Sequence, residues 1–365
     1  MTRITLMSDI DINNSIQWDI EIQESLYRMN KDEIDEISNK INQIADEDMK
    51  ISFLNMVFVL FEDNYRSHDF IANLLSKINN IDFSKRIKNI PKQLAYKLFK
   101  NGKIDIDTIK KQAKTDDLIR FTFSKELNLK PTLWFYTDKK ELTDKEFEEI
   151  IEYGYPKGSY EYILKFDLIN ELIDQIASST IDINKYCDVN AFDGVFATTR
   201  YSPLSFTALY GSIECFKYLI RNINEIPADL DKWAVIGGNL EIFRIICQEN
   251  LLNSNCHEVC IKFNQNLIFD WLQENVRFDT NNYISRAANN PRALVYYVQN
   301  GYDVDAQIEN ASASHECAAI NNLRFLKYLF ENGADKNKKT ALGDSILNVA
   351  QMFGSQNVIQ YLTHI

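Results

Sequence analysis

The stretch that decides the fold is Ser202-Pro-Leu-Ser-Phe-Thr-Ala-Leu-Tyr-Gly-Ser-Ile-Glu-Cys-Phe-Lys-Tyr-Leu-Ile220. It returns in altered form as Cys317-Ala-Ala-Ile-Asn-Asn-Leu-Arg-Phe-Leu-Lys-Tyr-Leu-Phe-Glu-Asn-Gly-Ala-Asp335 and as Ser345-Ile-Leu-Asn-Val-Ala-Gln-Met-Phe-Gly-Ser-Gln-Asn-Val-Ile-Gln-Tyr-Leu362. Repetition at a period of about 20 to 50 residues is typical of chains that stack one supersecondary unit on the next. The sequence therefore predicts a solenoid, an architecture that more often offers a binding surface than an active site.

Each copy consists of a turn signal, small or apolar residues, a Gly or Asn, and a second apolar segment. Gly and Asn tolerate the left-handed backbone that joins two short helices into a hairpin. Aligned on that position, the helix junctions fall at Asp167, Gly211, Gly238, Asn264, Asn289, Asn321 and Gly354. The second helix of each hairpin is predicted to supply the core, with Phe216, Phe243 and Phe330 among its members.

These residues resemble the ankyrin repeat. Glu331-Asn-Gly-Ala-Asp335 is similar to the inter-repeat turn of that family, and the 33-residue step from Asn321 to Gly354 matches its period. Ser202-Pro-Leu and Ser345-Ile-Leu stand where the family has Thr-Pro-Leu-His, without the His. The chain is similar to the divergent ankyrin-repeat proteins abundant in parasitic protists. The resemblance implies an all-α, ankyrin-type α-solenoid of stacked helix hairpins and a role in protein binding.

The expected domains are a helical N-terminal domain, residues 1–157, and an ankyrin-repeat array of about six to seven units, several truncated, at 158–365. Between 31 and 44, isoleucines recur on one helical face, and the run from Ile51 to Phe61 predicts a buried helix. Thr143-Asp-Lys-Glu146 predicts a capping box. We expect the N-terminal helices to pack on the first hairpin as its cap, because a terminal repeat must cover an apolar face.

Charge and composition narrow the class of partner. The net charge is −12 and the pI is about 5.0, so nucleic acid and anionic membranes should repel the chain. A protein partner of basic character is favoured. The N-terminus lacks the apolar stretch of a signal peptide, and the six Cys show no extracellular disulfide framework. These features predict a cytoplasmic protein with reduced thiols.

Residues 85–114 are basic although the chain as a whole is acidic. They contain ten basic residues and two acidic ones, Asp105 and Asp107. Such a block could dock an acidic partner or RNA. It could also neutralise the acidic segment in front of it by packing alongside. The second interpretation is favoured, because only Tyr96 and Phe99 supply the aromatic rings expected of a nucleic-acid groove.

No sequence motif indicates a catalytic residue or a cofactor site. The phosphate-binding loop, the dinucleotide-binding fingerprint and the serine-hydrolase motif are all absent from the sequence. Cys256-His-Glu-Val-Cys260 has zinc-ligand residue types, but a tetrahedral site needs a fourth ligand, so a short inter-repeat turn is favoured. The expected function is a non-catalytic interaction scaffold or adaptor that binds through the ankyrin finger and concave surface. The alternative is an effector-type protein whose N-terminal domain carries an enzymatic or nucleic-acid-binding activity targeted by the repeats.

Partner-binding residues are expected in the inter-repeat turns and in the insertion between Cys187 and Tyr201, where large side chains have no role within their own hairpin. Phe192 and Phe196 could equally cap the core where the N-terminal domain docks. At the other end, Tyr361, Leu362 and Ile365 give the C-terminal helix little polar shielding, so we expect it to be covered either by a partner or by weak self-association. The candidate residues are Phe192, Phe196, Arg200, Tyr201, Phe278, Tyr283 and Tyr302.

Overall fold

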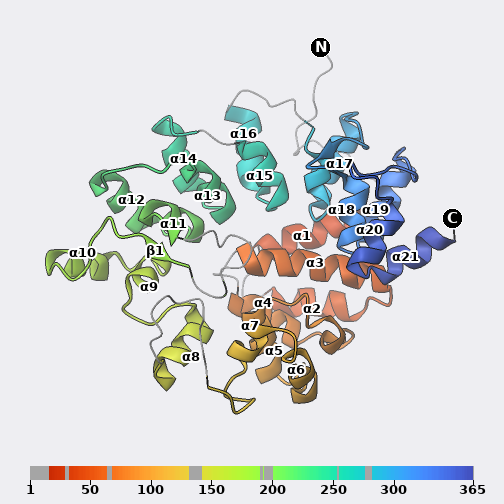
Figure 1. The fold of residues 1–365 in the computed structure, drawn as a ribbon. Helices are drawn as coiled ribbons and strands as arrows, with labels where there is room; N and C mark the ends of the chain where they lie inside the picture. The colour runs from red at the N-terminus through yellow and green to blue at the C-terminus, as the bar shows by residue number, and fades with distance from the viewer. Residues whose placement is uncertain are drawn as a thin grey trace. The chain divides into compact units, whose positions relative to one another are not determined.

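The structure is a computed structural model that describes residues 16–28, 33–63, 68–130, 142–189, 192, 200–252, 255–275 and 282–364. Its ordered elements are almost all helices, as the sequence predicted (Figure 1). The chain divides into two compact units. One joins Met1–Leu60 to Asn255–Ile365, and the other is Phe61–Ser254. The boundary expected at 157/158 therefore falls inside the second unit.

The unit of residues 61–254 holds one set of short helices and then three helix hairpins. The first set is α4 (His68–Ser76), η3 (Phe83–Arg86), α5 (Lys92–Lys100), α6 (Ile106–Gln112), α7 (Asp117–Thr122) and α8 (Asp144–Tyr153). The hairpins are α9 (Tyr160–Lys165) with α10 (Ile169–Ala177), α11 (Pro203–Tyr210) with α12 (Ile213–Asn222), and α13 (Leu230–Gly237) with α14 (Leu240–Gln248). Strands β1 (Cys187–Asp188) and β2 (Arg200–Tyr201) form the finger between the first two hairpins.

The other unit contains three N-terminal helices and four hairpins. The N-terminal helices are α1 (Gln17–Arg28), α2 (Ile34–Asn42) and α3 (Glu47–Asp63). The hairpins are α15 (Cys256–Lys262) with α16 (Asn266–Asn275), η5 (Ile284–Ala287) with α17 (Pro291–Gln299), α18 (Ala313–Ala319) with α19 (Leu323–Glu331), and α20 (Ile346–Phe353) with α21 (Gln356–Thr363). A second finger pairs β3 (Gln307–Ile308) with β4 (Ala311–Ser312).

The hairpin junctions are those that the sequence predicted. Six have a left-handed backbone, with φ between 57° and 69°: Asp167, Gly211, Gly238, Asn264, Asn321 and Gly354. Asn289 is the exception, because the first helix of its hairpin is the 3-10 helix η5. The stacked hairpins, left-handed junctions and antiparallel fingers are the features of ankyrin-type repeats, so the predicted fold is confirmed.

Polar side chains just after several junctions link consecutive hairpins. The Oγ of Ser212 donates to the carbonyl of Lys165 at 3.1 Å, and that of Ser355 donates to Ala319 at 3.2 Å. The Nδ2 of Asn322 likewise donates to Ala288 at 3.3 Å. Each bond satisfies a carbonyl near the end of the preceding first helix, which has no partner within its own helix. The small polar residue after the junction therefore fixes the spacing of the stack.

Close approach between α11 and α13 requires Gly237. A Cβ at this position would lie 2.1 Å from the carbonyl oxygen of Ala208. The second helices then supply the core, where Phe216 and Phe243 are fully buried as predicted. Phe330 is only half-buried and stacks on Tyr361, and Phe325 of the same helix is buried in full. The predicted role of Phe330 as a core residue is thus corrected.

The N-terminal helices follow the sequence patterns locally. On α2 the side chains of Ile34, Ile37 and Ile41 are buried, and α3 is buried along most of its length. Thr143 and Glu146 form the predicted capping box at the start of α8. The ring of Tyr153 on α8 lies edge-on to Tyr162 of α9, with ring centres 5.8 Å apart. Helix α8 thus contacts the first hairpin, as a cap is expected to do.

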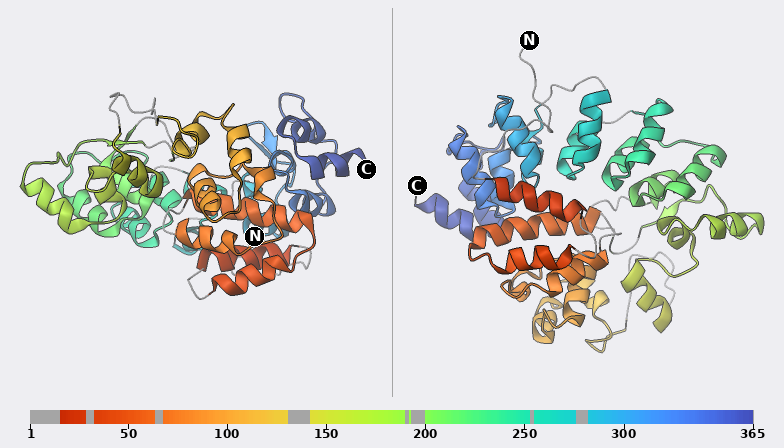
Figure 2. Two further views of the ribbon diagram at one scale, coloured as in Figure 1. Left: turned by 90° about the horizontal axis from the view of Figure 1, so that it is seen from below. Right: turned by 180° about the vertical axis from the view of Figure 1, so that it is seen from behind.

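Helices α1 and α3, here called the N-terminal helix pair, have a different position. They pack along the repeats of residues 255–365 (Figure 2, right). The Nδ2 of Asn55 on α3 donates to the carbonyl of Ile320 at a hairpin junction, 3.1 Å away. Gln23 on α1 is buried and donates to Asn264 at 3.1 Å. The helix pair thus lies on the edge of the stack where the junctions follow one another, instead of on the first hairpin, where it was expected.

Candidate partner-binding surface

The structure places two of the predicted binding residues in the core. Tyr201 is 2% exposed and stands edge-on to Trp233 with ring centres 5.0 Å apart. Tyr283 is 5% exposed, and its hydroxyl is paired with the side chain of Asn255. Both residues belong to inter-repeat segments as expected, but their rings fill space between hairpins. Neither side chain is available to a partner in this conformation.

The remaining candidates are distributed over both units. Arg200 is exposed and pairs with Asp188 across the first finger, with 3.0 Å between Nε and Oδ1. Tyr302 is half-buried, and its ring stands 4.9 Å from that of Tyr297. Phe192 packs beside Phe121 and the helix α8, which agrees with the alternative that it caps a core. Phe196 and Phe278 lie outside the described residues.

A charged cluster that the sequence did not single out occupies the first helices of the repeats at 255–287. The guanidinium of Arg286 on η5 pairs with Glu258 on α15 at 2.8 Å and with Glu309 in the second finger at 2.9 Å. Arg286 is largely shielded, whereas Glu309 is mostly exposed. The charges of Arg286 and Glu309 also act on Glu316 of the adjacent helix α18: Arg286 lowers the pKa of Glu316 and Glu309 raises it. We call Glu258, Arg286, Glu309 and Glu316 the carboxylate cluster.

Glu316 differs in its surroundings from the two glutamates that bind Arg286. Its side chain is half-buried, and burial is the main cause that raises its pKa above the ordinary value. The positive charges of Arg286 and Lys262 offset this effect only in part. Glu309, in contrast, has its pKa lowered by the hydrogen bond and charge of Arg286. The cluster therefore holds one well-paired finger carboxylate and one carboxylate that a further cation would stabilise.

The basic block at 85–114 is neutralised in part by carboxylates within its own unit. Lys97 pairs with Asp69 and Glu152, each at 2.9 Å, and Lys100 pairs with Glu126 at 2.7 Å. The structural interpretation of this block is thereby supported. Its counterions come partly from the acidic segment in front of it and partly from helices that follow it.

The Cys256-His-Glu-Val-Cys260 cluster lies on helix α15 and not in the inter-repeat turn that was expected. All three potential ligands are buried, and the ring of His257 stands edge-on to Phe269. Burial raises the pKa of the Cys260 thiol well above its usual value, which opposes thiolate formation. Among the described residues, no group of three or more His, Cys, Asp or Glu side chains is arranged to hold a metal ion.

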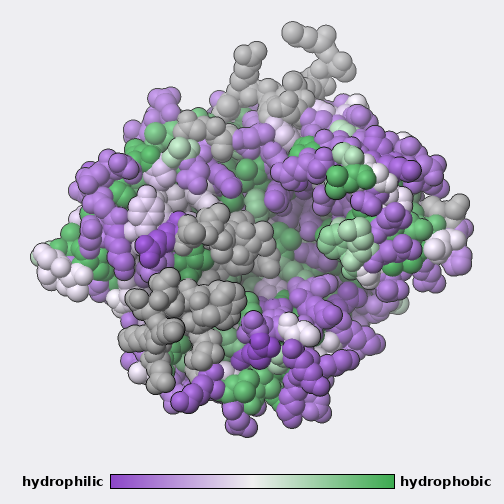
Figure 3. All heavy atoms as spheres, in the orientation of Figure 1, coloured by the Kyte–Doolittle hydropathy of each residue, from purple (hydrophilic) through white to green (hydrophobic). Residues whose placement is uncertain are grey.

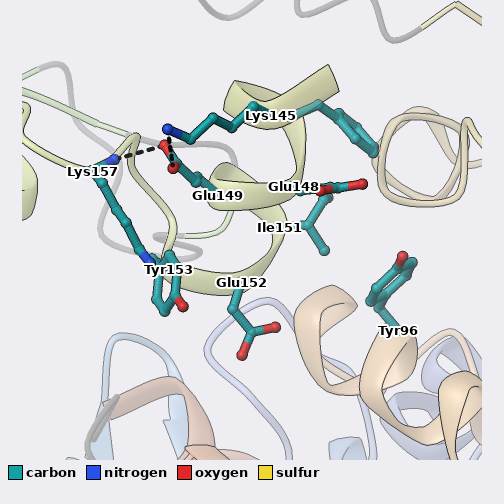
Figure 4. Close-up of a pocket in the computed structure, with 9 residues that line it drawn as sticks. Tyr96, Lys145, Glu148, Glu149, Ile151, Glu152, Tyr153 and Lys157 are labelled. Carbon is teal, nitrogen blue, oxygen red and sulfur yellow. Dashed lines mark hydrogen bonds and ion pairs between the residues drawn. The ribbon is translucent and has the colours of Figure 1, made fainter. Parts of the chain in front are cut away.

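A surface pocket of about 420 Å³ lies between α8 and the side chain of Tyr96 (Figure 4). Glu149 stands between Lys145 and Lys157 there, and accepts a hydrogen bond from the backbone N–H of Lys157 at 2.9 Å. The residues lining the pocket include Glu, Lys and Tyr but no Ser, Cys or His. It thus lacks the Ser–His or Cys–His pair that nucleophilic acyl transfer uses.

On the face shown in Figure 3, hydrophilic side chains predominate and apolar side chains form separate groups. Two of the largest exposed apolar side chains lie at the end of α20: Met352 is 71% and Phe353 is 66% exposed. Within the described residues, every helix is too short or too polar to cross a membrane.

Comparison with known proteins gives structural neighbours only. No protein-family model and no curated protein matches the chain. One similar structure is the human ASB11 ankyrin repeat domain, with a TM-score of 0.36 and 17% identity over 54% of this chain and 96% of that one. Another is the ankyrin repeat domain of Bcl-3, of the IkappaB protein family, with a TM-score of 0.33 and 15% identity over 54% and 96%. The assignment of ankyrin-type repeats here rests on the hairpins, junctions and fingers themselves.

Sequence inspection also missed one residue of the repeat pattern. Ser312-Ala-Ser-His315 occupies the position of Thr-Pro-Leu-His and retains the His. The Nδ1 of His315 lies 2.8 Å from the Oγ of Ser312 and accepts from its backbone N–H at 3.3 Å. Burial lowers the pKa of His315, so this cap holds a neutral imidazole. The signal was present in the sequence, two residues before the copy of the phrase that begins at Cys317.

Proposed function

We propose that the protein is a non-catalytic scaffold that binds a basic protein partner through the finger side of its repeats. The carboxylate cluster is the centre of the proposed site. It joins three first helices, α15, η5 and α18, to the exposed finger residue Glu309. A surface built from several repeats suits a partner that lies across them.

The single observation that carries the proposal is the environment of Glu316. A half-buried carboxylate with a raised pKa costs stability at neutral pH unless a cation neutralises it. A lysine or arginine of a partner that approaches Glu316 and Glu309 would supply that cation. Charge-assisted hydrogen bonds of this kind give specificity and speed association. Arg200 on the first finger and Tyr302 beside the second remain proposed contributors.

The proposal is tested by capture of proteins from an extract of the protein's own cells. The variant Glu309→Lys/Glu316→Lys should lose basic proteins that the parent chain retains. Glu274→Lys/Glu331→Lys carries the same change in charge at exposed positions on the second helices α16 and α19, and should retain them. Retention of the same set by all three chains would refute the proposed site.

We also propose weak self-association through the C-terminal hairpin. Met352 and Phe353 are exposed at the end of α20, and α20 is the first helix of the last described hairpin. Met352→Glu/Phe353→Ser should abolish any concentration-dependent increase in the sedimentation coefficient. A parent chain that sediments as a strict monomer at high concentration would refute the proposal.

We propose that the protein acts in the cytoplasm. All six cysteines are unpaired and most are buried, which is typical of proteins in reducing compartments. Recovery of the tagged chain in a membrane or secreted fraction would contradict this placement.

A further inference from the structure

One position in the hairpins lies on the junction edge of the stack and contacts the helix that packs there. It is the residue three places after the junction, in the first turn of the second helix. In three of the four hairpins of 255–364 this residue contacts a carboxylate of the N-terminal helix pair, and in the hairpin of α15 and α16 it is the exposed Leu267. Arg324 binds Asp19 at 2.7 Å, Arg292 binds Glu24 at 3.4 Å, and Asn357 binds Asp48 at 2.6 Å. The chain itself thus shows how a helix binds along this edge.

The same position holds a carboxylate in two of the three hairpins of residues 61–254, and Asn170 in the other. Counting from Gly211 and Gly238, it is occupied by Glu214 and Glu241, both exposed. Lys217 lies between them, 2.7 Å from Glu241 and 3.4 Å from Glu214. Lys217 therefore forms ion pairs with two carboxylates, and its contact with Glu214 is the longer of the two. This part of the edge carries negative charge that its own lysine leaves only partly neutralised.

A second position on the junction edge is occupied by apolar residues in both units. It lies two places after the junction: in the unit that holds the helix pair, Pro291 and Leu323 are buried there, and the other two hairpins have Asn266 and Gln356. The equivalent residues in the other unit are Ile169, Ile213 and Leu240, and all three are only half-buried. Half-exposed apolar residues flanked by carboxylates match the apolar and basic faces of an amphipathic helix.

We propose that the junction edge of residues 167–241 binds a basic amphipathic helix of a partner protein. The helix would lie across Ile213 and Leu240, as α1 lies across the junctions at 264–324, with its lysines or arginines on Glu214 and Glu241. A basic side chain competes with Lys217 first at Glu214, where the existing contact is longer. Nucleic acid does not fit, because carboxylates repel phosphates. This surface is separate from the carboxylate cluster, and the inference does not rest on the proposed function.

The test uses a charge-reversed copy of α1 as the probe. A fluorescein-labelled peptide of residues 17–28 with Asp19→Arg and Glu24→Arg is titrated with the full chain, and fluorescence anisotropy is measured. The unmodified peptide of residues 17–28 is the matched control. The parent chain should bind the charge-reversed peptide about tenfold or more tightly than the unmodified one, since like charges oppose docking of the latter.

Three protein variants complete the design. Glu214→Lys/Glu241→Lys should weaken binding of the charge-reversed peptide by about tenfold or more. Glu225→Lys/Glu249→Lys makes the same charge change at exposed positions away from the edge and should bind as the parent does. Glu309→Lys/Glu316→Lys should also bind as the parent does, which separates this surface from the carboxylate cluster. Circular dichroism checks that each variant is folded.

Hydrogen exchange gives a readout that does not depend on the variants. The charge-reversed peptide should slow amide exchange around 211–215 and 238–242 in the parent chain. Equal binding to the parent and to Glu214→Lys/Glu241→Lys would overturn the proposal. So would the absence of binding, or protection confined to other segments.

Discussion

Asp19 and Arg324, 305 positions apart in the chain, form a buried ion pair that fixes α1 on α19. The carboxylate of Asp19 accepts from Nη2 of Arg324 at 2.7 Å and from Nε at 3.1 Å. The Oγ of Ser52 on α3 donates to the other carboxylate oxygen at 2.6 Å. Asp19 has no exposed surface, so the pair ties both members of the N-terminal helix pair to the repeats.

Removal of the arginine should destabilise the protein more than neutralisation of the aspartate. Arg324→Ala leaves a buried carboxylate with only Ser52 as its side-chain partner, a change that costs about 3–5 kcal/mol. Asp19→Asn keeps a polar group for Ser52, and the charge that remains is that of Arg324, whose side chain is 20% exposed and can be partly solvated, so we expect a smaller loss. Urea unfolding measures both. Arg221→Ala, at an exposed position, is the control and should stay within about 0.5 kcal/mol of the parent.

The pH dependence of stability should change when Glu316 is replaced by glutamine. The raised pKa means that the folded state keeps the proton to a higher pH than the unfolded state does. Stability is therefore lost as the pH rises from the ordinary pKa of glutamate, about 4.3, to the raised value. Glu316→Gln cannot lose that proton, so its stability relative to the parent should increase across this window.

This variant also separates stability from binding. If Glu316 serves a basic partner, Glu316→Gln should be at least as stable as the parent at neutral pH and yet capture that partner less well. Glu309→Gln is the comparison, because the pKa of Glu309 is lowered and its charge already helps to hold Arg286. A parallel pH profile for Glu316→Gln and the parent would contradict the assigned surroundings of Glu316.

Truncation of core phenylalanines should follow the burial that the structure shows. Phe216→Ala and Phe243→Ala each leave a cavity in the core and should cost about 3–5 kcal/mol. Phe330→Ala should cost less, because that ring is half-buried and stacks on Tyr361 near the C-terminal end. Chemical denaturation would rank the three variants. A loss for Phe330→Ala as large as that for Phe216→Ala would contradict the revised packing.

A methyl group at Gly237 should disrupt the contact between the second and third hairpins. The added Cβ would meet the backbone carbonyls of Ala208 and Leu209, which cannot move aside as a flexible side chain could. Overpacking of this kind costs about 1–3 kcal/mol. Thermal unfolding of Gly237→Ala measures it, with Lys232→Ala on the exposed face of the same helix as the control. An unchanged thermal unfolding midpoint for Gly237→Ala would contradict the close contact between α11 and α13.

The repeats were predictable from sequence because their signals are local. A left-handed junction such as Gly211, a small residue before it and a buried ring such as Phe216 all recur within one hairpin. The position of the N-terminal helix pair was not predictable in this way. Asp19 and Gln23 interrupt the apolar pattern of α1 and would normally indicate a solvated face, yet both are buried. Gln23 donates to Asn264, 241 positions away, and Asp19 binds Arg324, 305 positions away, in addition to Ser52, so no local pattern indicates that they are satisfied.

The candidate site was less predictable for a related reason. Large aromatic residues in the turns were expected to be free because they have no role in their own hairpin, but Tyr201 and Tyr283 pack between hairpins. Glu258, Arg286 and Glu316 each look like an ordinary solvated charge in the sequence. They become a cluster only when successive first helices are placed next to one another, which requires the register of the stack.

Substitutions at two adjacent finger residues should separate packing from surface chemistry. Tyr201→Ala removes a buried ring that contacts Trp233 and Phe206, and should cost about 3–5 kcal/mol. Arg200→Ala removes only an exposed ion pair with Asp188, worth about 0–1 kcal/mol. Urea unfolding and partner capture are measured on each single variant. A loss of capture in Arg200→Ala with unchanged stability would place the first finger in the interface. If capture falls only in Tyr201→Ala, in proportion to lost stability, the finger acts through the fold alone.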